Sequence, residues 1–109
     1  MSGIKNIVNK TSSLLVGSIT PRIGSNPQQS GPPVNFEIPA GQSQVVTYGN
    51  DQNPFMNGMT ASSKTDGTSL LEGSWQVISR GGFVDDLFNT NSTITVTQAK
   101  TGLLIDGSN

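Results

Sequence analysis

The sequence contains neither cysteine nor histidine among its 109 residues. Without cysteine, the chain forms no disulfide and offers no thiolate ligand to a metal ion. General-base catalysis, nucleophile activation and transition-metal binding rely on histidine and cysteine more than on other residue types. We therefore expect a protein that is not an enzyme and needs no cofactor, and a copper site is excluded.

Charged residues are also scarce, at 12% of the chain, which is about half the share found in an ordinary soluble domain. The net charge is −1, and no two lysines or arginines are adjacent in the sequence. Nucleic-acid binding and polybasic contact with anionic lipid both need clustered cations. The sequence therefore predicts no nucleic-acid partner and no polybasic membrane contact.

Long apolar runs are missing as well. Residues Met1–Asn6 lack the apolar core of a signal peptide, and Ser12–Ile19 is too short and too polar to span a membrane. We expect no signal peptide and no transmembrane segment. The protein is then either cytoplasmic or exported by a route that uses no cleaved leader.

Neutral polar and small residues take the place of charge, because Ser, Thr, Asn and Gly account for 48 of the 109 residues. Threonine favours pleated sheet, whereas Asn, Gly and Ser favour turns. Alanine occurs only three times, and no stretch sustains apolar residues at helical spacing over three turns. A chain of this length has room for one core, so we expect a single β-domain over residues 1–109.

Apolar residues recur with the period of two that is typical of strands. In the stretch 93–97, Ile94 and Val96 alternate with threonines, and in the stretch 34–38 three apolar residues alternate with Asn35 and Glu37. The turn residues 39–42 separate 34–38 from 43–48, so these two segments are predicted to form a hairpin. The segment 34–48 resembles the strand-turn-strand pattern of immunoglobulin-like sandwiches and cupredoxins. Strands are predicted at residues 4–8, 13–20, 34–38, 43–48, 56–62, 69–80, 93–97 and 103–106.

Seven or eight short strands separated by frequent turns indicate a sandwich or a barrel, of which we favour the sandwich. The predicted fold class is all-β: an antiparallel two-sheet β-sandwich, immunoglobulin-like or jelly-roll-like. Gly73 is predicted to mark a bulge or bend in the long strand 69–80. Residues 84–88 are predicted to form a single helical turn between strands.

Two polar segments, 22–33 and 49–57, are predicted to be the loops that bind a ligand. Saccharide sites combine an aromatic face with neutral amides or carboxylates. Trp75 is the only tryptophan of the chain, and the core of a small sandwich is the usual place for such a residue. The first hypothesis is therefore a small lectin-like module with a carbohydrate or protein ligand. Its candidate ligand-binding residues are Tyr48, Asn50, Asp51, Gln52, Asn53, Phe55, Asn57 and Trp75.

Carboxylates allow two further interpretations. Asp85, Asp86 and Asn89 form a candidate calcium site because hard cations need only oxygen ligands, although Asx-rich segments more often form ordinary turns. Glu37 and Glu72 lie in predicted strands and are interpreted as solvent-facing carboxylates rather than a glycosidase pair.

Two alternatives to the lectin-like hypothesis belong to other functional classes. The uncharged, β-prone segments 44–48 and 93–97 are predicted to be open sheet edges, which favours a homo-oligomer or a structural interaction protein. Phe55, Met56 and Met59 suggest a membrane-active sandwich if they are exposed, although core packing is the default for such residues.

Overall fold

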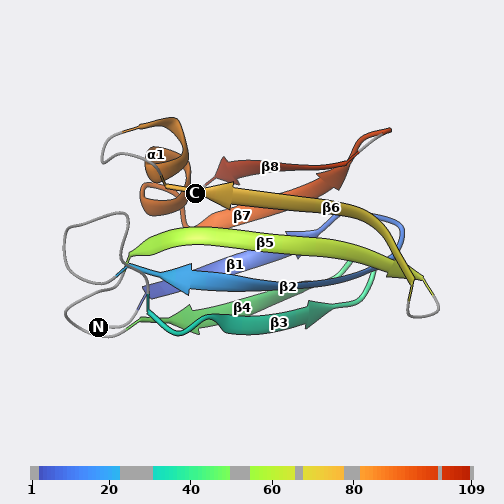
Figure 1. Cartoon of the computed structure of the whole chain (residues 1–109), viewed down its shortest axis with the longest axis horizontal. Helices are drawn as coiled ribbons and strands as arrows, with labels where there is room; N and C mark the ends of the chain where they lie inside the picture. The colour runs from blue at the N-terminus through green and yellow to red at the C-terminus, as the bar shows by residue number, and fades with distance from the viewer. Residues whose placement is uncertain are drawn as a thin grey trace.

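The computed structural model describes residues 3–22, 31–49, 55–65, 68–77, 82–100 and 102–108. Within these residues, eight strands form two four-stranded sheets, with one short helix. Sheet A contains, in spatial order, β4 (Ser43–Tyr48), β1 (Gly3–Asn9), β7 (Thr93–Gln98) and β8 (Leu103–Ser108). Sheet B contains β3 (Val34–Ile38), β2 (Leu14–Pro21), β5 (Met56–Thr65) and β6 (Thr68–Gln76). The long strands of both sheets run along the length of the molecule (Figure 1).

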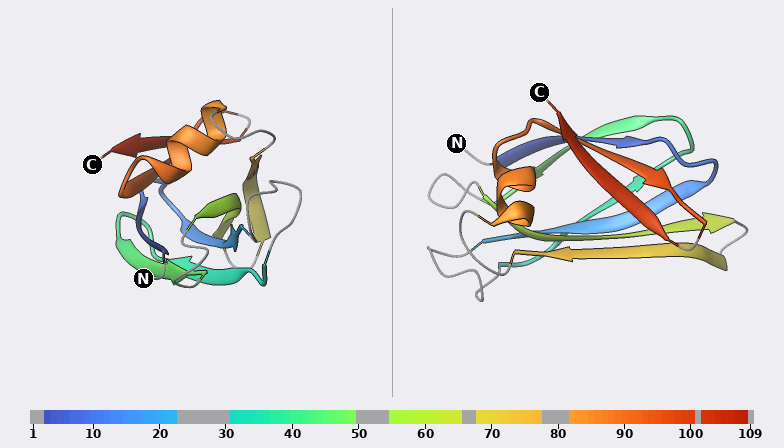
Figure 2. Two further views of the ribbon diagram at one scale, coloured as in Figure 1. Left: turned by 90° about the vertical axis from the view of Figure 1, so that its left-hand side faces the viewer. Right: turned by 90° about the horizontal axis from the view of Figure 1, so that it is seen from above.

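The two sheets enclose one buried apolar cluster, so the predicted all-β two-sheet sandwich is confirmed. The end-on view in Figure 2 shows the sheets on opposite sides of a common interior. Ile94 and Val96 of β7 are buried while the threonines beside them face outward, as the alternation predicted. Phe36 and Ile38 of β3 are buried in the same way.

The sheets are not wholly antiparallel, which corrects the sequence prediction. Strand β1 pairs with β4 antiparallel, but it pairs with β7 parallel, with Ile7 beside Ile94. The two strands are far apart in sequence and no hairpin joins them, so nothing forces the antiparallel direction.

The predicted hairpin between 34–38 and 43–48 is wrong. Strand β3 pairs with β2, and β4 pairs with β1, so residues 39–42 cross from sheet B to sheet A. Asn9 holds this crossing in place, because its backbone N–H donates to Gln42 O and its carbonyl accepts from Gly41 N–H, both at 2.9 Å. Gly41 has φ +75°, a left-handed conformation that glycine adopts without strain.

Glycines in sheet B allow close packing rather than marking bends. The register shift between β5 and β6 lies at Ser63/Lys64, opposite residues 69–71, so the bulge predicted at Gly73 is in another place. Gly73 pairs regularly with Ala61, and the ring of Trp75 occupies the space that a side chain at position 73 would need. At Gly17, a Cβ would lie 2.1 Å from the backbone oxygen of Thr60, which no real side chain tolerates.

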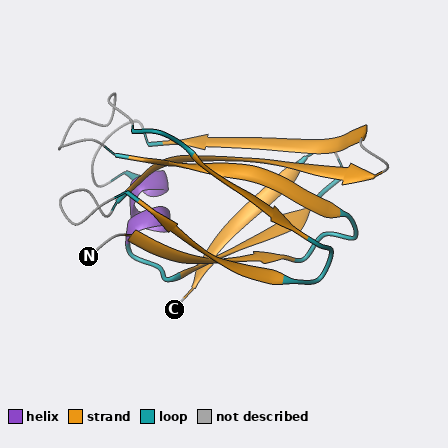
Figure 3. Ribbon diagram, turned by 90° about the horizontal axis from the view of Figure 1, so that it is seen from below, coloured by secondary structure: helices purple, strands orange, loops and turns teal. Residues whose placement is uncertain are grey.

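Helix α1 (Phe83–Asn89) closes one end of the sandwich (Figure 3). The sequence predicted a helical turn here. Phe88 is fully buried, and Val84 and Leu87 pack against the core from the same side of the helix. The strand ends at Pro21, Tyr48 and Met56 lie near this end of the molecule, so it is called the helix end below.

Candidate functional site

Two of the candidate ligand-binding residues lie inside the sandwich. Tyr48 at the end of β4 is 2% exposed, and burial raises the pKa of its phenol to about 12. Asn57 near the start of β5 is likewise buried. Asn50, Asp51, Gln52 and Asn53 lie outside the described residues. Burial of Tyr48 and Asn57 favours a structural role for both.

The other two candidates, Trp75 and Phe55, differ in exposure. Trp75 is half-buried and packs against the core from β6, an edge strand of sheet B, whereas Tyr48 belongs to an edge strand of sheet A. Phe55 is 45% exposed at the helix end, and the guanidinium of Arg22 lies 5.7 Å from the centre of its ring. Of the three candidate aromatic residues, only Phe55 therefore presents a largely open face.

The candidate calcium ligands are engaged with protein groups. Asp85 forms an ion pair with the buried Arg22, and the same oxygen, Oδ1, accepts from Asn89 Nδ2 at 2.7 Å. Asn89 also pairs with the backbone of Met56: its Oδ1 accepts from Met56 N–H at 2.8 Å, and its Nδ2 donates to Met56 O at 3.1 Å. Asp86 is exposed on α1. Among the described residues, no three acidic side chains gather into a metal-binding group.

The structure removes most of the basis for the membrane-active hypothesis. Met56 and Met59 are fully buried in the core, so of the three residues on which it rested only Phe55 is exposed. No helix in the described part of the chain is long and apolar enough to cross a membrane.

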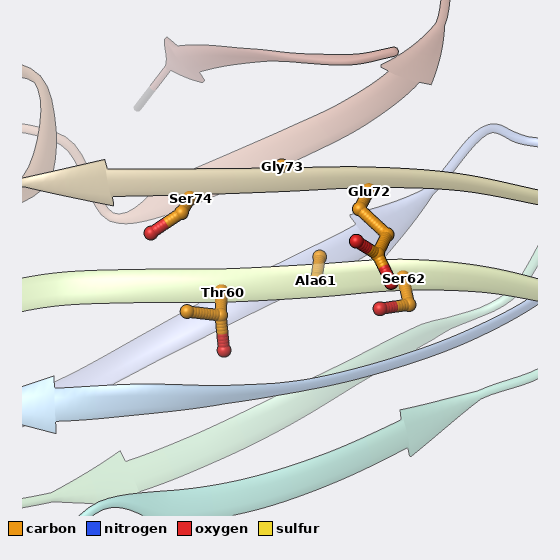
Figure 4. Close-up of a pocket in the computed structure, with 6 residues that line it drawn as sticks. All are labelled: Thr60, Ala61, Ser62, Glu72, Gly73 and Ser74. Atoms are coloured by element: carbon orange, nitrogen blue, oxygen red, sulfur yellow. The ribbon is translucent and has the colours of Figure 1, made fainter. Parts of the chain in front are cut away.

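The outer face of sheet B is hydroxyl-rich. One row across its strands contains Asn35, Ser18, Thr60 and Ser74, and the Ser18 and Thr60 hydroxyls are hydrogen-bonded at 2.9 Å. Over β5 and β6 lies an open depression of about 350 Å³. Figure 4 shows Thr60, Ser62, Glu72 and Ser74 around it, with Ala61 pointing the other way. This face offers hydroxyls and a carboxylate to a polar ligand.

Glu37 and Glu72 lie in the next row of the same outer face, at its two edges. Glu37 is opposite Val16, Val16 is opposite Ser62, and Ser62 is opposite Glu72. Three strand spacings separate the two carboxylates, which is about 14 Å. The two catalytic carboxylates of a glycosidase lie about 5–10 Å apart, so the register supports the interpretation of Glu37 and Glu72 as separate surface groups.

The four edge strands differ in charge. Strands β3, β6 and β8 each carry one carboxylate, at Glu37, Glu72 and Asp106, whereas β4 carries no charged residue. Within the described part of the chain, β1 is the only strand that pairs with β4. The prediction that 44–48 is a sheet edge is therefore confirmed. The same prediction for 93–97 is wrong, because β7 lies between β1 and β8.

Apolar side chains accompany this edge on the outer face of sheet A. Val45 is 63% exposed, and Ile4 on the neighbouring β1 is 51% exposed. Ile4 pairs with Thr47, and Val45 pairs with Asn6, so Ile4 and Val45 are diagonal neighbours on one face. Lys5, between Ile4 and Asn6, points inward and donates to the backbone oxygen of Asn91 at 2.5 Å. The lysine charge is thus removed from the outer face.

Compared with protein-family models, with curated proteins and with solved structures, the chain shows no match to any of them.

Proposed function

We propose that this chain is a non-catalytic, self-assembling interaction domain that binds another polypeptide strand along β4. The observation that carries this proposal is the charge pattern of the edges: three edge strands have a carboxylate and β4 has none. An edge strand presents unpaired backbone N–H and C=O groups, and proteins that must stay apart commonly guard such edges with charges, prolines or bulges.

The side chains of β4 support the same proposal. Ser43, Val45 and Thr47 alternate on its outer face, and none of them is costly to bury against a second strand. Among the described large apolar residues, Val45 has the largest fraction of its surface exposed to solvent. Strand addition would cover Val45 and pair the backbone groups at once, so apolar burial and hydrogen bonding favour the same contact.

The test is the molecular mass in solution over a range of concentrations, measured by light scattering and sedimentation velocity. The wild-type chain is expected to associate as its concentration rises, and Val45→Lys is expected to remain monomeric. Leu104→Lys is the matched control, because Leu104 is 57% exposed on β8, the opposite edge strand of sheet A. A wild-type chain that stays monomeric at every concentration overturns the proposal. Equal loss in both variants would assign association to the whole outer face instead of the β4 edge.

Saccharide recognition is the second candidate, supported by the outer face of sheet B. The cross-strand row of Asn35, Ser18, Thr60 and Ser74 and the carboxylate of Glu72 offer the neutral and charged acceptors that sugar hydroxyls use. A glycan array probed with the wild-type chain and with Thr60→Val tests this candidate. Binding that is lost in Thr60→Val supports it, and an array without signal ends it.

The finer classification of the sandwich is also a proposal. A jelly roll contains eight strands in two sheets, and the strand count of this chain agrees with that arrangement. An immunoglobulin-like arrangement is the alternative. Neither classification changes which strands lie at the edges.

A further inference from the structure

We propose that the partner of β4 is the same strand of a second copy of this chain, antiparallel about a two-fold axis that passes beside Val45. This inference rests on the proposed function, because it specifies the partner and the register at the same edge. The result would be a closed dimer in which the two copies of sheet A form one continuous sheet.

The outward-facing residues of β4 are nearly symmetric about Val45. Reading along the strand, they are Ser43, Val45 and Thr47, a hydroxyl on each side of one β-branched apolar residue. In an antiparallel pair centred on Val45, the valines of the two copies lie opposite each other. Each Ser43 then lies opposite the second copy's Thr47. Opposed valines bury apolar surface, and Ser–Thr pairs are favourable across strands.

Charge distinguishes β4 from the other edges as a partner for itself. A two-fold pairing of β3, β6 or β8 would bring two copies of Glu37, Glu72 or Asp106 onto the same short ribbon. Like charges at close range across strands are destabilising. Strand β4 has no charge to repel its own copy. Of the four edge strands, it is therefore the one best suited to pair with the same strand of a second chain.

The surroundings of β4 limit the contact to one strand length. Gly41 precedes the strand and Gly49 follows it, and both have positive φ, of 75° and 66°. The extended conformation is therefore limited to a six-residue strand. Because a two-fold contact uses the same edge of both copies, it closes on itself and leaves no β4 edge for a third copy. Ile4 of each copy lies diagonally beside Val45 and widens the apolar centre.

The absence of cysteine makes disulfide cross-linking a direct test of this register. Residues directly opposite in an antiparallel pair have Cα atoms about 4.5–5.5 Å apart, within the range that a disulfide spans. Val45→Cys is therefore expected to form a covalent dimer rapidly under mild oxidation. Leu104→Cys is the matched control, since Leu104 is similarly exposed on the opposite edge of sheet A, and it is expected to cross-link only slowly by collision.

A mixed experiment fixes the register. Ser43→Cys and Thr47→Cys are each expected to cross-link poorly alone, because four residues of strand, about 13 Å, separate equivalent positions. An equimolar mixture of the two variants is expected to yield the cross-linked heterodimer. Circular dichroism confirms the fold of each variant, and all three positions are exposed.

The outcomes separate this inference from the proposed function. If the wild-type chain associates and Val45→Lys prevents association, but Val45→Cys cross-links no faster than Leu104→Cys, the two-fold register is wrong while assembly at β4 stands. If the wild-type chain remains monomeric and no variant cross-links faster than the control, both are wrong. Rapid cross-linking of Val45→Cys, together with the selective Ser43/Thr47 heterodimer, establishes the register.

Discussion

The side-chain Nδ2 of Asn9 donates to the backbone oxygen of Ile38 at 2.9 Å, across the point where the chain leaves sheet B for sheet A. Asn9 is fully buried at the end of β1, and the same nitrogen also donates to Ser13 O at 2.9 Å and to Pro39 O at 3.2 Å. Its Oδ1 accepts from the backbone N–H of Thr11 at 2.9 Å. One amide therefore ties together two connections, 10–13 and 39–42, each of which crosses between the two sheets.

Replacing this amide is expected to destabilise the whole sandwich. Asn9→Ala removes the donor from three carbonyls and the acceptor from Thr11, and leaving buried polar groups unpaired costs about 1–3 kcal/mol for each group. We expect a loss of about 3 kcal/mol in the free energy of unfolding, measured by urea denaturation. Asn35→Ala, at an exposed position of β3, is the control and is expected to change stability by less than about 0.5 kcal/mol. Equal stabilities of the two variants would contradict this role for Asn9.

Asn9 also explains why the predicted hairpin failed. Residues 39–42 have the composition of a tight turn, and sequence proximity favours pairing of the flanking strands. The turn instead changes sheet because its backbone bonds to Asn9, about 30 residues earlier. Only the folded arrangement brings Asn9 to this turn, so local sequence patterns contain no signal for it.

Alternation predicted the faces of some strands and not of others. In β7 every apolar residue shares one face, so Ile94 and Val96 were placed correctly. In β1 the apolar residues fall on both faces, because Ile4 lies outside and Ile7 inside. Lys5 and Asn9 share the inner face with Ile7. A buried lysine and asparagine contradict the hydrophobic pattern, and distant backbone carbonyls are what make their burial possible.

The residues of the candidate site likewise divide into those that the sequence predicted and those that it did not. The lack of charge in 44–48 is a property of the sequence alone, and it identified an edge strand that the structure confirms. Residues 93–97 are likewise uncharged, yet β7 is central because it pairs with β1 on one side and β8 on the other. The burial of Tyr48 was equally beyond prediction, because an aromatic residue beside polar residues suits a binding loop as well as a core.

Gly17→Ala is expected to be among the most damaging small substitutions in this chain. The added Cβ would lie 2.1 Å from Thr60 O and 2.7 Å from the ring of Phe36, and the backbone oxygen is fixed in the β2–β5 ladder. We expect a loss of about 3 kcal/mol or more, or failure to fold. Gly102→Ala is the matched control, since its nearest contact, 3.7 Å to Glu72 O, is ordinary van der Waals contact. Thermal unfolding of both variants checks the difference, and a Gly17→Ala protein as stable as wild type would show that β2 and β5 lie farther apart.

Two buried titratable groups on sheet A are expected to change stability in opposite directions as the pH rises in alkaline solution. Burial lowers the pKa of Lys5 below 10.5, so between its folded value and 10.5 the unfolded chain binds more protons at this position. Stability from Lys5 therefore rises with pH in that window. Burial raises the pKa of Tyr48 from 10.0 to about 12, so in that interval the folded chain retains the proton and stability falls as pH rises.

Urea denaturation midpoints between neutral pH and about pH 12 measure both slopes. Lys5→Met is expected to remove the contribution that rises with pH below 10.5, because methionine fills the space without an ionisable amine. Tyr48→Phe is expected to weaken the fall in stability between pH 10.0 and about 12. A Lys5→Met protein whose midpoints follow the wild-type slope below pH 10.5 would show that the amine titrates normally in the folded chain.

Because Asp85 forms an ion pair with the buried Arg22 at the helix end, the stability of the fold is expected to depend strongly on this one carboxylate. The Arg22 side chain is 5% exposed and that of Asp85 is 13% exposed. Asp85→Ala therefore leaves the buried guanidinium without its carboxylate partner. Removing one partner of a buried pair costs about 3–5 kcal/mol, and we expect a loss near the lower figure. Asp86→Ala, the adjacent and exposed carboxylate, is the matched control and is expected to change stability by less than about 0.5 kcal/mol.

A second substitution and a metal titration separate this ion pair from the calcium site predicted for the same residues. If Asp85 acts by neutralising Arg22, then adding Arg22→Met to Asp85→Ala restores part of the lost stability, because no buried charge remains. If Asp85 instead binds calcium with Asp86 and Asn89, then millimolar calcium raises the unfolding temperature of the wild-type chain, and either aspartate variant abolishes the rise. Oδ1 of Asp85 already accepts hydrogen bonds from Arg22 and from Asn89 Nδ2. We therefore expect calcium to leave the unfolding temperature unchanged.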